Sequence, residues 1–204
     1  MLHLDHLAVS CENLNDGRDW VEERLARSLQ PGGKHTKLGT HNMLLGLEEG
    51  VYFELIAIDP DAPDPGQRRW FDLDDFSGAP RLTNWICQTN DIDAALAKAP
   101  IGMGVPMELT RGDLRWMMVA GEDGHLPFDA AFPAVISWGS SPHPSTRLPS
   151  SGLKLRQLTV RHPDAETLRA NLGPILDDPR IKFEQGSTSL EAVFDGPDGE
   201  KVIS

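Results

Sequence analysis

Glu54 stands in the middle of the apolar stretch VYFELIAI, residues 51–58. Side chains alternate between the two faces of a β-strand, so Glu54 shares a face with Tyr52 and Ile56. A carboxylate buried on such a face is costly unless it is solvated, paired, protonated or bound to a cation. Glu54 is therefore a candidate general base or metal ligand. Pairing with a neighbouring basic or amide group is the structural alternative.

The stretch HNMLLGL before Glu54 predicts the partner strand of a β-hairpin, and the register of this hairpin decides which side chain meets the carboxylate. A three-residue loop over 48–50, closed by Gly50 in a left-handed conformation, places Asn42 on the face of Glu54. A two-residue loop would place His41 there instead. Gly50 favours the first register, so Asn42 is the predicted pocket residue.

Composition limits the classes of partner. The 204 residues carry 19 basic and 31 acidic side chains, a net charge of −12, which disfavours nucleic acid and anionic membrane surfaces as partners. No apolar run is long enough for a transmembrane helix, and the N-terminus does not have the pattern of a signal peptide. Cys11 and Cys87 are too few and too isolated for a disulfide framework or a zinc cluster. The expected location is the cytoplasm.

Three segments share one pattern: LDHLAVS from Leu4, LTNWICQ from Leu82 and LRQLTVR from Leu155. Each alternates as a half-buried strand and precedes a helical pattern, and each helix precedes a hairpin with a glycine in its turn. The sequence therefore predicts large repeated modules of a strand, a helix and further antiparallel strands. The third segment offers a strand, a helix and a hairpin.

These patterns, together with GTHN before YFELIAI, NWICQTNDIDAA, FPAVISWG and HPSTRLPSSGLKLRQLTVRHP, resemble the glyoxalase-like domain family of the vicinal oxygen chelate superfamily. The resemblance implies an α+β fold in which paired βαβββ modules form an open curved sheet around a cavity. It implies a glyoxalase-like core over 1–139, with module one at 1–59, a crossover at 60–81 and module two at 82–139. A linker at 140–152 then leads to a C-terminal half-module at 153–204 that packs on the core.

The crossover is rich in proline and aspartate, so we expect a long connection or a lid rather than a regular element. Its basic pair Arg68 and Arg69 has two interpretations: a grip on an anionic substrate group, or pairing with the acids at 72–75. The net acidity of the chain favours the second.

The resemblance also implies metal ligands, one His or Gln and one Glu from each module. His6 and Glu54 match these positions in module one. Module two departs from the pattern, because Asn84 stands at the position of His6 and the last strand offers only Ser137, with Asp129 before it. Two ligands are fewer than a catalytic metal normally needs, so a divalent metal at His6 and Glu54 is the one possible cofactor, at an incomplete site.

Two functions follow from these residues. The first is an enzyme of the lyase, isomerase or dioxygenase type that acts on a small oxygenated metabolite, with His6 and Glu54 as catalytic residues and Asn42, Asn84 and Trp85 binding the substrate. The second is a metal-free protein that binds or sequesters a small molecule in the same cavity. Lactoylglutathione lyase activity is disfavoured by the missing acid in module two. Either protein could form a homodimer.

Overall fold

The computed structural model describes residues 1–48 and 50–204. Glu49, one residue of the predicted hairpin loop, lies outside this range. The described chain contains two successive runs of a strand, a helix and three further strands, and we call them module one and module two. Module one contains β1 (His3–Ser10), α1 (Leu14–Leu25), β2 (Gln30–His35), β3 (Thr40–Gly46) and β4 (Tyr52–Ile58). Module two contains β5 (Arg81–Gln88), α2 (Ile92–Leu96), β6 (Met107–Arg111), β7 (Leu114–Val119) and β8 (Ala134–Ser137).

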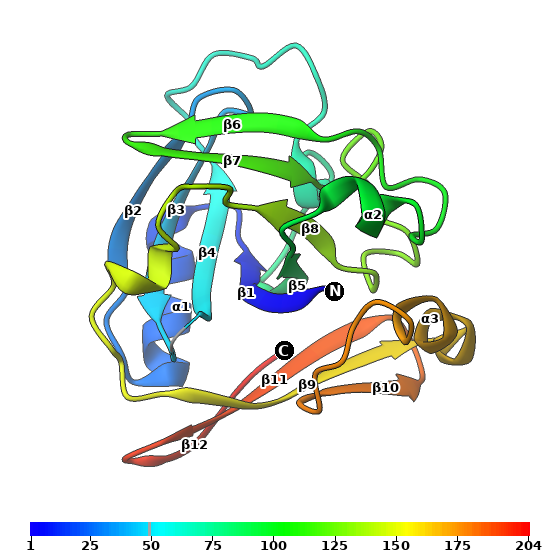
Figure 1. Cartoon of the computed structure of the whole chain (residues 1–204). Coiled ribbons are helices and arrows are strands. Elements are labelled where there is room, and N and C mark those ends of the chain that lie inside the picture. Colours follow the sequence, from blue (N-terminus) through cyan, green and yellow to red (C-terminus); the bar gives the residue numbers. More distant parts are fainter. Residues whose placement is uncertain (49) are drawn as a thin grey trace.

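Both modules build one curved sheet with the strand order β2-β3-β4-β1-β5-β8-β7-β6 (Figure 1). β1 and β5 pair antiparallel at its centre, and each also pairs in parallel with the last strand of its own module. The two edge strands, β2 and β6, lie close to each other: a Cβ on Gly33 of β2 would lie 2.6 Å from Arg111 Cδ of β6. Arg111 Nη1 also donates to Asn42 Oδ1 of β3 at 3.2 Å. The sheet is therefore nearly closed, and its concave face is enclosed.

The hairpin register is the one favoured by Gly50. Leu44 lies opposite Glu54 and Asn42 lies opposite Ile56, so Asn42 and Glu54 share a face of the sheet. Gly50 has a φ of 79°, the left-handed conformation that a three-residue turn of this type requires.

Local sequence explains where the helices begin. The side chain of Asn13 accepts hydrogen bonds from the N–H groups of Asn15 and Asp16 and caps α1, which buries Val21 and Leu25 against the sheet. Asp91 caps α2 by accepting a hydrogen bond from the N–H of Ala94.

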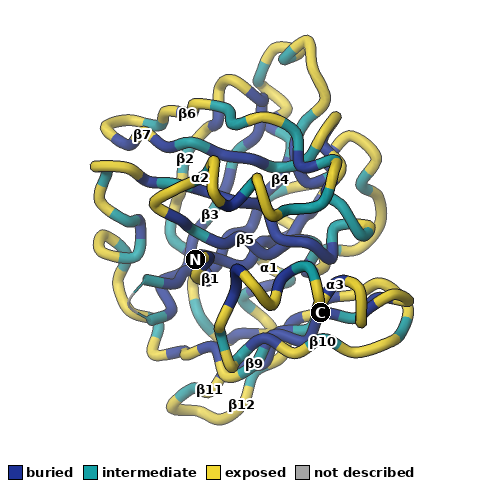
Figure 2. Tube along the Cα trace, turned by 45° about the vertical axis from the view of Figure 1, so that its right-hand side comes forward, coloured by how far each residue is buried: buried dark blue, intermediate teal, exposed yellow. Residues whose placement is uncertain are grey.

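The C-terminal unit forms a second sheet with the order β10-β9-β11-β12. It contains β9 (Lys154–His162), α3 (Ala165–Leu172), β10 (Ile181–Gln185), β11 (Ser189–Gly196) and β12 (Gly199–Ile203), so β10 adds a strand to the predicted strand, helix and hairpin. This sheet packs on the convex face of the large one, where Phe194 contacts Phe53 at 6.4 Å and Phe183 contacts Trp85 at 6.5 Å between ring centroids. The strands of both sheets are buried where they face each other (Figure 2).

The crossover between β4 and β5 contains one short 3-10 helix, η1 (Trp70–Asp72), and a second one, η2 (Pro144–Thr146), precedes the C-terminal unit. Trp70 and Phe71 are buried against the concave face of the large sheet. Arg68 pairs with Asp75 and Arg69 pairs with Asp74, so the acidic neighbours take both arginines as predicted. Within the described chain, no helix has the length and apolar character needed to cross a bilayer.

Candidate active site

A small cavity lies inside the curved sheet, and we call it the inner cavity. Its free volume is about 20 Å³, which leaves room for little more than one water molecule. Side chains from both modules and from the crossover line it: His6, His35, Asn42, Tyr52, Glu54, Trp70, Phe71, Arg111, Trp116, Met118, Ile136 and Trp138.

The structure brings together three of the predicted site residues in this cavity. His6 Nε2 lies 3.4 Å from Glu54 Oε2, and the Asn42 amide donates to Glu54 Oε1 at 2.5 Å. All three side chains are at most 5% exposed. The Tyr52 ring stacks on the imidazole with 4.4 Å between centroids and fixes its plane. The carboxylate is thus paired with a basic group and an amide, the structural alternative considered for Glu54.

Asp5 is a further member of the site, and sequence reasoning missed it. Strict alternation would place it on the face opposite His6, but the pairing of β1 with β5 shifts register between Leu4 and His6. Such a bulge re-aims side chains, and Asp5 Oδ1 lies 2.6 Å from His6 Nδ1. Two adjacent polar residues within an apolar strand were the available signal.

The second carboxylate oxygen of Asp5, Oδ2, contacts side chains from distant parts of the chain. Trp138 Nε1 donates to Oδ2 at 2.9 Å, and His143 Nε2 lies 3.0 Å from the same oxygen. His143 is the N-cap residue of η2, between the two sheets in sequence, and its type and spacing gave no signal for this contact. Asp5 is completely buried, so these bonds replace the water that its carboxylate has lost.

His6 lies between the carboxylates of Asp5 and Glu54, and we call this row of side chains the line Asp5–His6–Glu54. Its contacts determine the pKa values of His6 and Glu54. Burial alone would lower the pKa of His6, but the hydrogen bonds and negative charges of Asp5 and Glu54 raise it to about 9. Burial alone would raise the pKa of Glu54, but His6, His35 and Asn42 lower it to about 2. Near neutral pH, the cavity therefore holds an imidazolium between two carboxylates.

Two glycines of β2 make room for the other polar groups of the cavity. A Cβ on Gly32 would lie 2.0 Å from Asn42 Oδ1, and a Cβ on Gly33 would lie 2.6 Å from Arg111 Cδ. The sequence PGGK thus lets the Asn42 and Arg111 side chains pass close to the backbone of β2.

Arg111 brings a second positive charge to the cavity. Its Nη1 lies 3.3 Å from His35 Nε2 and 3.2 Å from Asn42 Oδ1. Burial lowers the pKa of His35 to about 4, so this imidazole stays neutral beside the guanidinium. Among the residues that the structure describes, no carboxylate lies within ion-pair distance of Arg111. Its charge is free to meet an anionic group.

Two predicted substrate-binding residues lie outside the inner cavity. Asn84 is on the concave face but lines two neighbouring clefts. Trp85 is on the opposite face of β5, fully buried between the sheets, where Nε1 donates to the Ala131 carbonyl at 3.0 Å. Adjacent residues of a strand point to opposite faces, so the position of Trp85 does not support its predicted contact with substrate.

The donors of the inner cavity do not suit a divalent metal. His6 Nε2 and Glu54 face each other, and the Asn42 oxygen already accepts bonds from the Gly33 N–H and from Arg111. Ser137, considered for module two, lines a separate surface cleft. Two protein ligands beside a guanidinium do not make a cation site.

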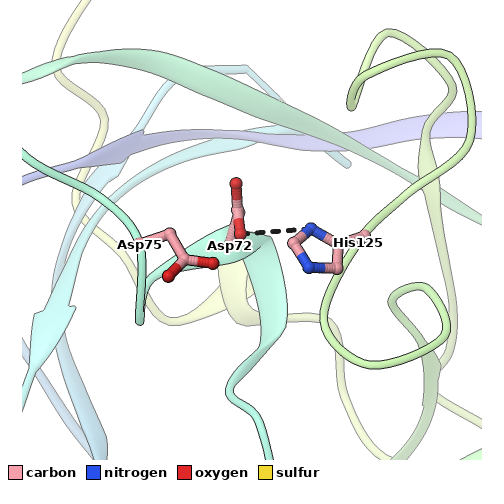
Figure 3. A group of neighbouring side chains, drawn as sticks. All are labelled: Asp72, Asp75 and His125. Atoms are coloured by element: carbon pink, nitrogen blue, oxygen red, sulfur yellow. Dashed lines mark ion pairs between the residues drawn. The ribbon is translucent and has the colours of Figure 1, made fainter.

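One group of three potential metal ligands does occur in the described chain, at Asp72, Asp75 and His125 (Figure 3). His125 Nδ1 lies 3.1 Å from Asp72 Oδ1, while Asp75 pairs with Arg68. The His125 and Asp75 side chains are more than half exposed, and the group lies outside the inner cavity.

Comparison with known proteins agrees with this architecture. The family model of the glyoxalase-like domain matches residues 4–176. The chain belongs to the glyoxalase-like domain family. The resemblance seen in the sequence is thereby confirmed, and with it the fold class. A comparison with curated proteins found no match.

Solved structures align with this glyoxalase-like protein. A hypothetical protein from Staphylococcus aureus aligns over 93% of this chain and 88% of its own, with a TM-score of 0.65 and 17% identity. Methylmalonyl-CoA epimerase from Mycobacterium tuberculosis aligns over 70% of this chain and 91% of its own, with a TM-score of 0.43 and 18% identity. At 17% identity, the likeness to the first of these structures concerns the fold alone.

Proposed function

We propose that this glyoxalase-like protein is an enzyme that moves a proton on a small oxygenated acid, in the manner of an isomerase. The observation that carries the proposal is the buried line Asp5–His6–Glu54, which ends in a cavity that also holds Arg111. Paired acids and bases with opposite shifts in pKa are typical of sites that transfer protons.

In the proposed reaction, Glu54 takes a proton from the carbon next to a substrate carbonyl. The C–H bond breaks, and its electron pair moves through the new C=C bond onto the carbonyl oxygen. That oxygen accepts a hydrogen bond from Nε2–H of protonated His6, which stabilises the enolate. Glu54 then returns a proton to the same carbon as the C=O bond re-forms, so atoms and charge balance without a further reactant.

The strength of Glu54 as a base depends on the substrate. Its pKa is low because His6 and Asn42 bond to the carboxylate, whereas burial works in the opposite direction. A substrate oxygen that takes over the hydrogen bond of His6 leaves burial as the larger influence, so the pKa of Glu54 rises and the carboxylate becomes a stronger base. Asp5 keeps His6 protonated and oriented during this exchange.

Arg111 gives the proposal its substrate class. A guanidinium without a carboxylate partner in the described chain, beside the reacting groups, suits the carboxylate of a small oxo acid. The neutral His35 and the Asn42 oxygen orient the guanidinium toward the cavity.

The test is exchange of substrate C–H protons in D₂O, followed by proton NMR over a panel of small 2-oxo and 3-oxo acids. The wild-type chain should accelerate exchange for at least one acid. Glu54→Gln and His6→Gln should each lower that rate by about 100-fold or more, in the range of general acid–base catalysis. Glu108→Gln, on the exposed pair with Arg115, is the control and should leave the rate unchanged.

Tight binding of an acid without any exchange would overturn the enzyme and favour a metal-free binding protein in the same cavity. The binding of each acid should therefore be measured in parallel by calorimetry.

A further inference from the structure

Buried polar atoms without a hydrogen-bond partner gather at one place in the described chain. They are Arg69 Nε, Trp70 Nε1 and both amide atoms of Asn84. Nearly all buried polar atoms of folded proteins are paired, so each exception calls for a reason. The first two belong to residues 69–72 of the crossover, which we call the plug. Asn84 faces the plug from β5.

The backbone of the plug is also unusual. Phe71 has a φ of 59° and Asp72 a φ of 56°, two consecutive left-handed residues of which neither is glycine. Such conformations are costly and persist only where surrounding contacts impose them. The contact here is made by the Asp72 N–H, which donates to the Gly124 carbonyl at 3.1 Å.

Phe71 stands between the inner cavity and the two clefts that Asn84 lines. It lines all three spaces, and the clefts have volumes of about 420 and 320 Å³. Ala8 of β1 pairs with Glu54 of β4 on one side and with Asn84 of β5 on the other. The Glu54 carboxylate and the Asn84 amide therefore lie on the same face of the sheet, each one strand away from Ala8. Phe71 is thus a shared wall of the inner cavity and both clefts.

The burial of Phe71 indicates what could replace it. Its side chain is 3% exposed and its ring stacks on Trp70, with 5.3 Å between centroids and 14° between planes. A ligand that displaces this ring must restore the lost apolar contact, and a flat ring stacked on Trp70 does so. The Asn84 amide needs both a donor and an acceptor, because neither of its polar atoms has a partner.

We propose that Phe71 holds the place of a substrate ring, and that the substrate is a ring-bearing oxygenated molecule. This inference rests on the proposed function and deepens it. The reacting oxygen lies at His6 and Glu54, the ring lies on Trp70 where Phe71 now packs, and a polar group on the ring exchanges hydrogen bonds with Asn84. The plug opens to admit the substrate, which relieves the strained backbone and pairs the Asn84 amide.

The test uses three probes with the full-length chain: benzamide, which has ring and amide; isopropylbenzene, which keeps the shape without polar atoms; and isobutyramide, which lacks the ring. Phe71→Gly suits the left-handed backbone and empties the ring site. Binding is measured by calorimetry or ligand-observed NMR. Phe71→Gly should bind benzamide at least tenfold more tightly than the wild-type chain does. The same variant should bind benzamide at least tenfold more tightly than isobutyramide. Adding Asn84→Leu should weaken benzamide at least tenfold and change isopropylbenzene less than twofold.

The wild-type chain provides the second measurement, which does not depend on the folding of a variant. It should bind benzamide weakly, and benzamide should change the fluorescence of Trp70, as shown by loss of the change in Trp70→Phe. No binding to wild type, or equal binding of benzamide by Phe71→Gly with and without Asn84→Leu, would overturn the ring site. Because no turnover is measured, failure of the proton-exchange assay would refute the reaction and leave this site standing.

Discussion

Asp5→Asn tests whether the negative charge behind His6 sets the properties of the site. The substitution keeps the size of the side chain and removes its charge. It also places an amide where the carboxylate now meets three groups, from His6, Trp138 and His143. We expect the pKa of His6 to fall from about 9 to near or below its ordinary value of 6.5, because burial lowers it and only Glu54 remains to raise it.

The magnitude follows from the same shift in pKa. One pKa unit corresponds to about 1.4 kcal/mol, so the rise from 6.5 to about 9 represents about 3 kcal/mol in favour of the buried imidazolium. Removing one partner of a buried ion pair typically costs about 3–5 kcal/mol. We expect Asp5→Asn to lower the free energy of unfolding by about 2–4 kcal/mol at pH 6, and by less than half of that at pH 10, where His6 is neutral.

Urea unfolding followed by tryptophan fluorescence at the two pH values measures the change, and NMR titration of the His6 ring gives its pKa. Asp113→Asn is the control, because it breaks an exposed pair with Arg147 and should have little effect at either pH. An equal loss of stability at both pH values, or a His6 pKa that stays near 9 in Asp5→Asn, would refute the reasoning.

Three other outcomes are expected. Gly33→Ala should push the Arg111 side chain out of the cavity, since its Cβ would lie 2.6 Å from Arg111 Cδ; carboxylate binding should weaken about tenfold, and unchanged binding would contradict this. The pairing of His6 and Glu54 should stabilise the fold most between pH 4.5 and 6.5, declining as His6 loses its proton toward pH 9 and as Glu54 gains one toward pH 2; thermal unfolding across pH, compared with Glu54→Gln, checks it. Dialysis against a chelator should leave the melting temperature unchanged, and a fall of several degrees would reveal a structural metal.

Local patterns in the sequence were sufficient to predict that Glu54 and Asn42 share one face of the sheet. Strand alternation places Glu54 inward, and Gly50 fixes the register that brings Asn42 to it. Both rules involve neighbours in sequence, so they need no knowledge of the tertiary fold. The position of His6 followed from resemblance to the family, and the structure places it 3.4 Å from Glu54.

The remaining members depend on contacts that no local pattern encodes. Asp5 joins the site through a bulge, which breaks the alternation on which the prediction relied. Arg111 reaches the site only because the edge strands of the curved sheet lie close to each other. His143, the N-cap residue of η2, contacts Asp5 although it lies 138 residues later in the sequence. Trp85 shows the converse: an aromatic residue beside Asn84 seemed suited to substrate, but the C-terminal sheet covers its face of β5.

The plug links the chemistry of the site to its accessibility. Charges interact more strongly where water is excluded, so the pairing of His6 with Glu54 owes its strength to the side chains that close the inner cavity, Trp70 and Phe71 among them. Opening the plug admits water, which weakens the ion pair between His6 and Glu54. Glu54 is then a stronger base than in the closed site. A substrate ring that takes the place of Phe71 excludes water again, now around a substrate oxygen instead of an ion pair. The same segment would thus keep the base inactive while the site is empty and release it when the site is filled.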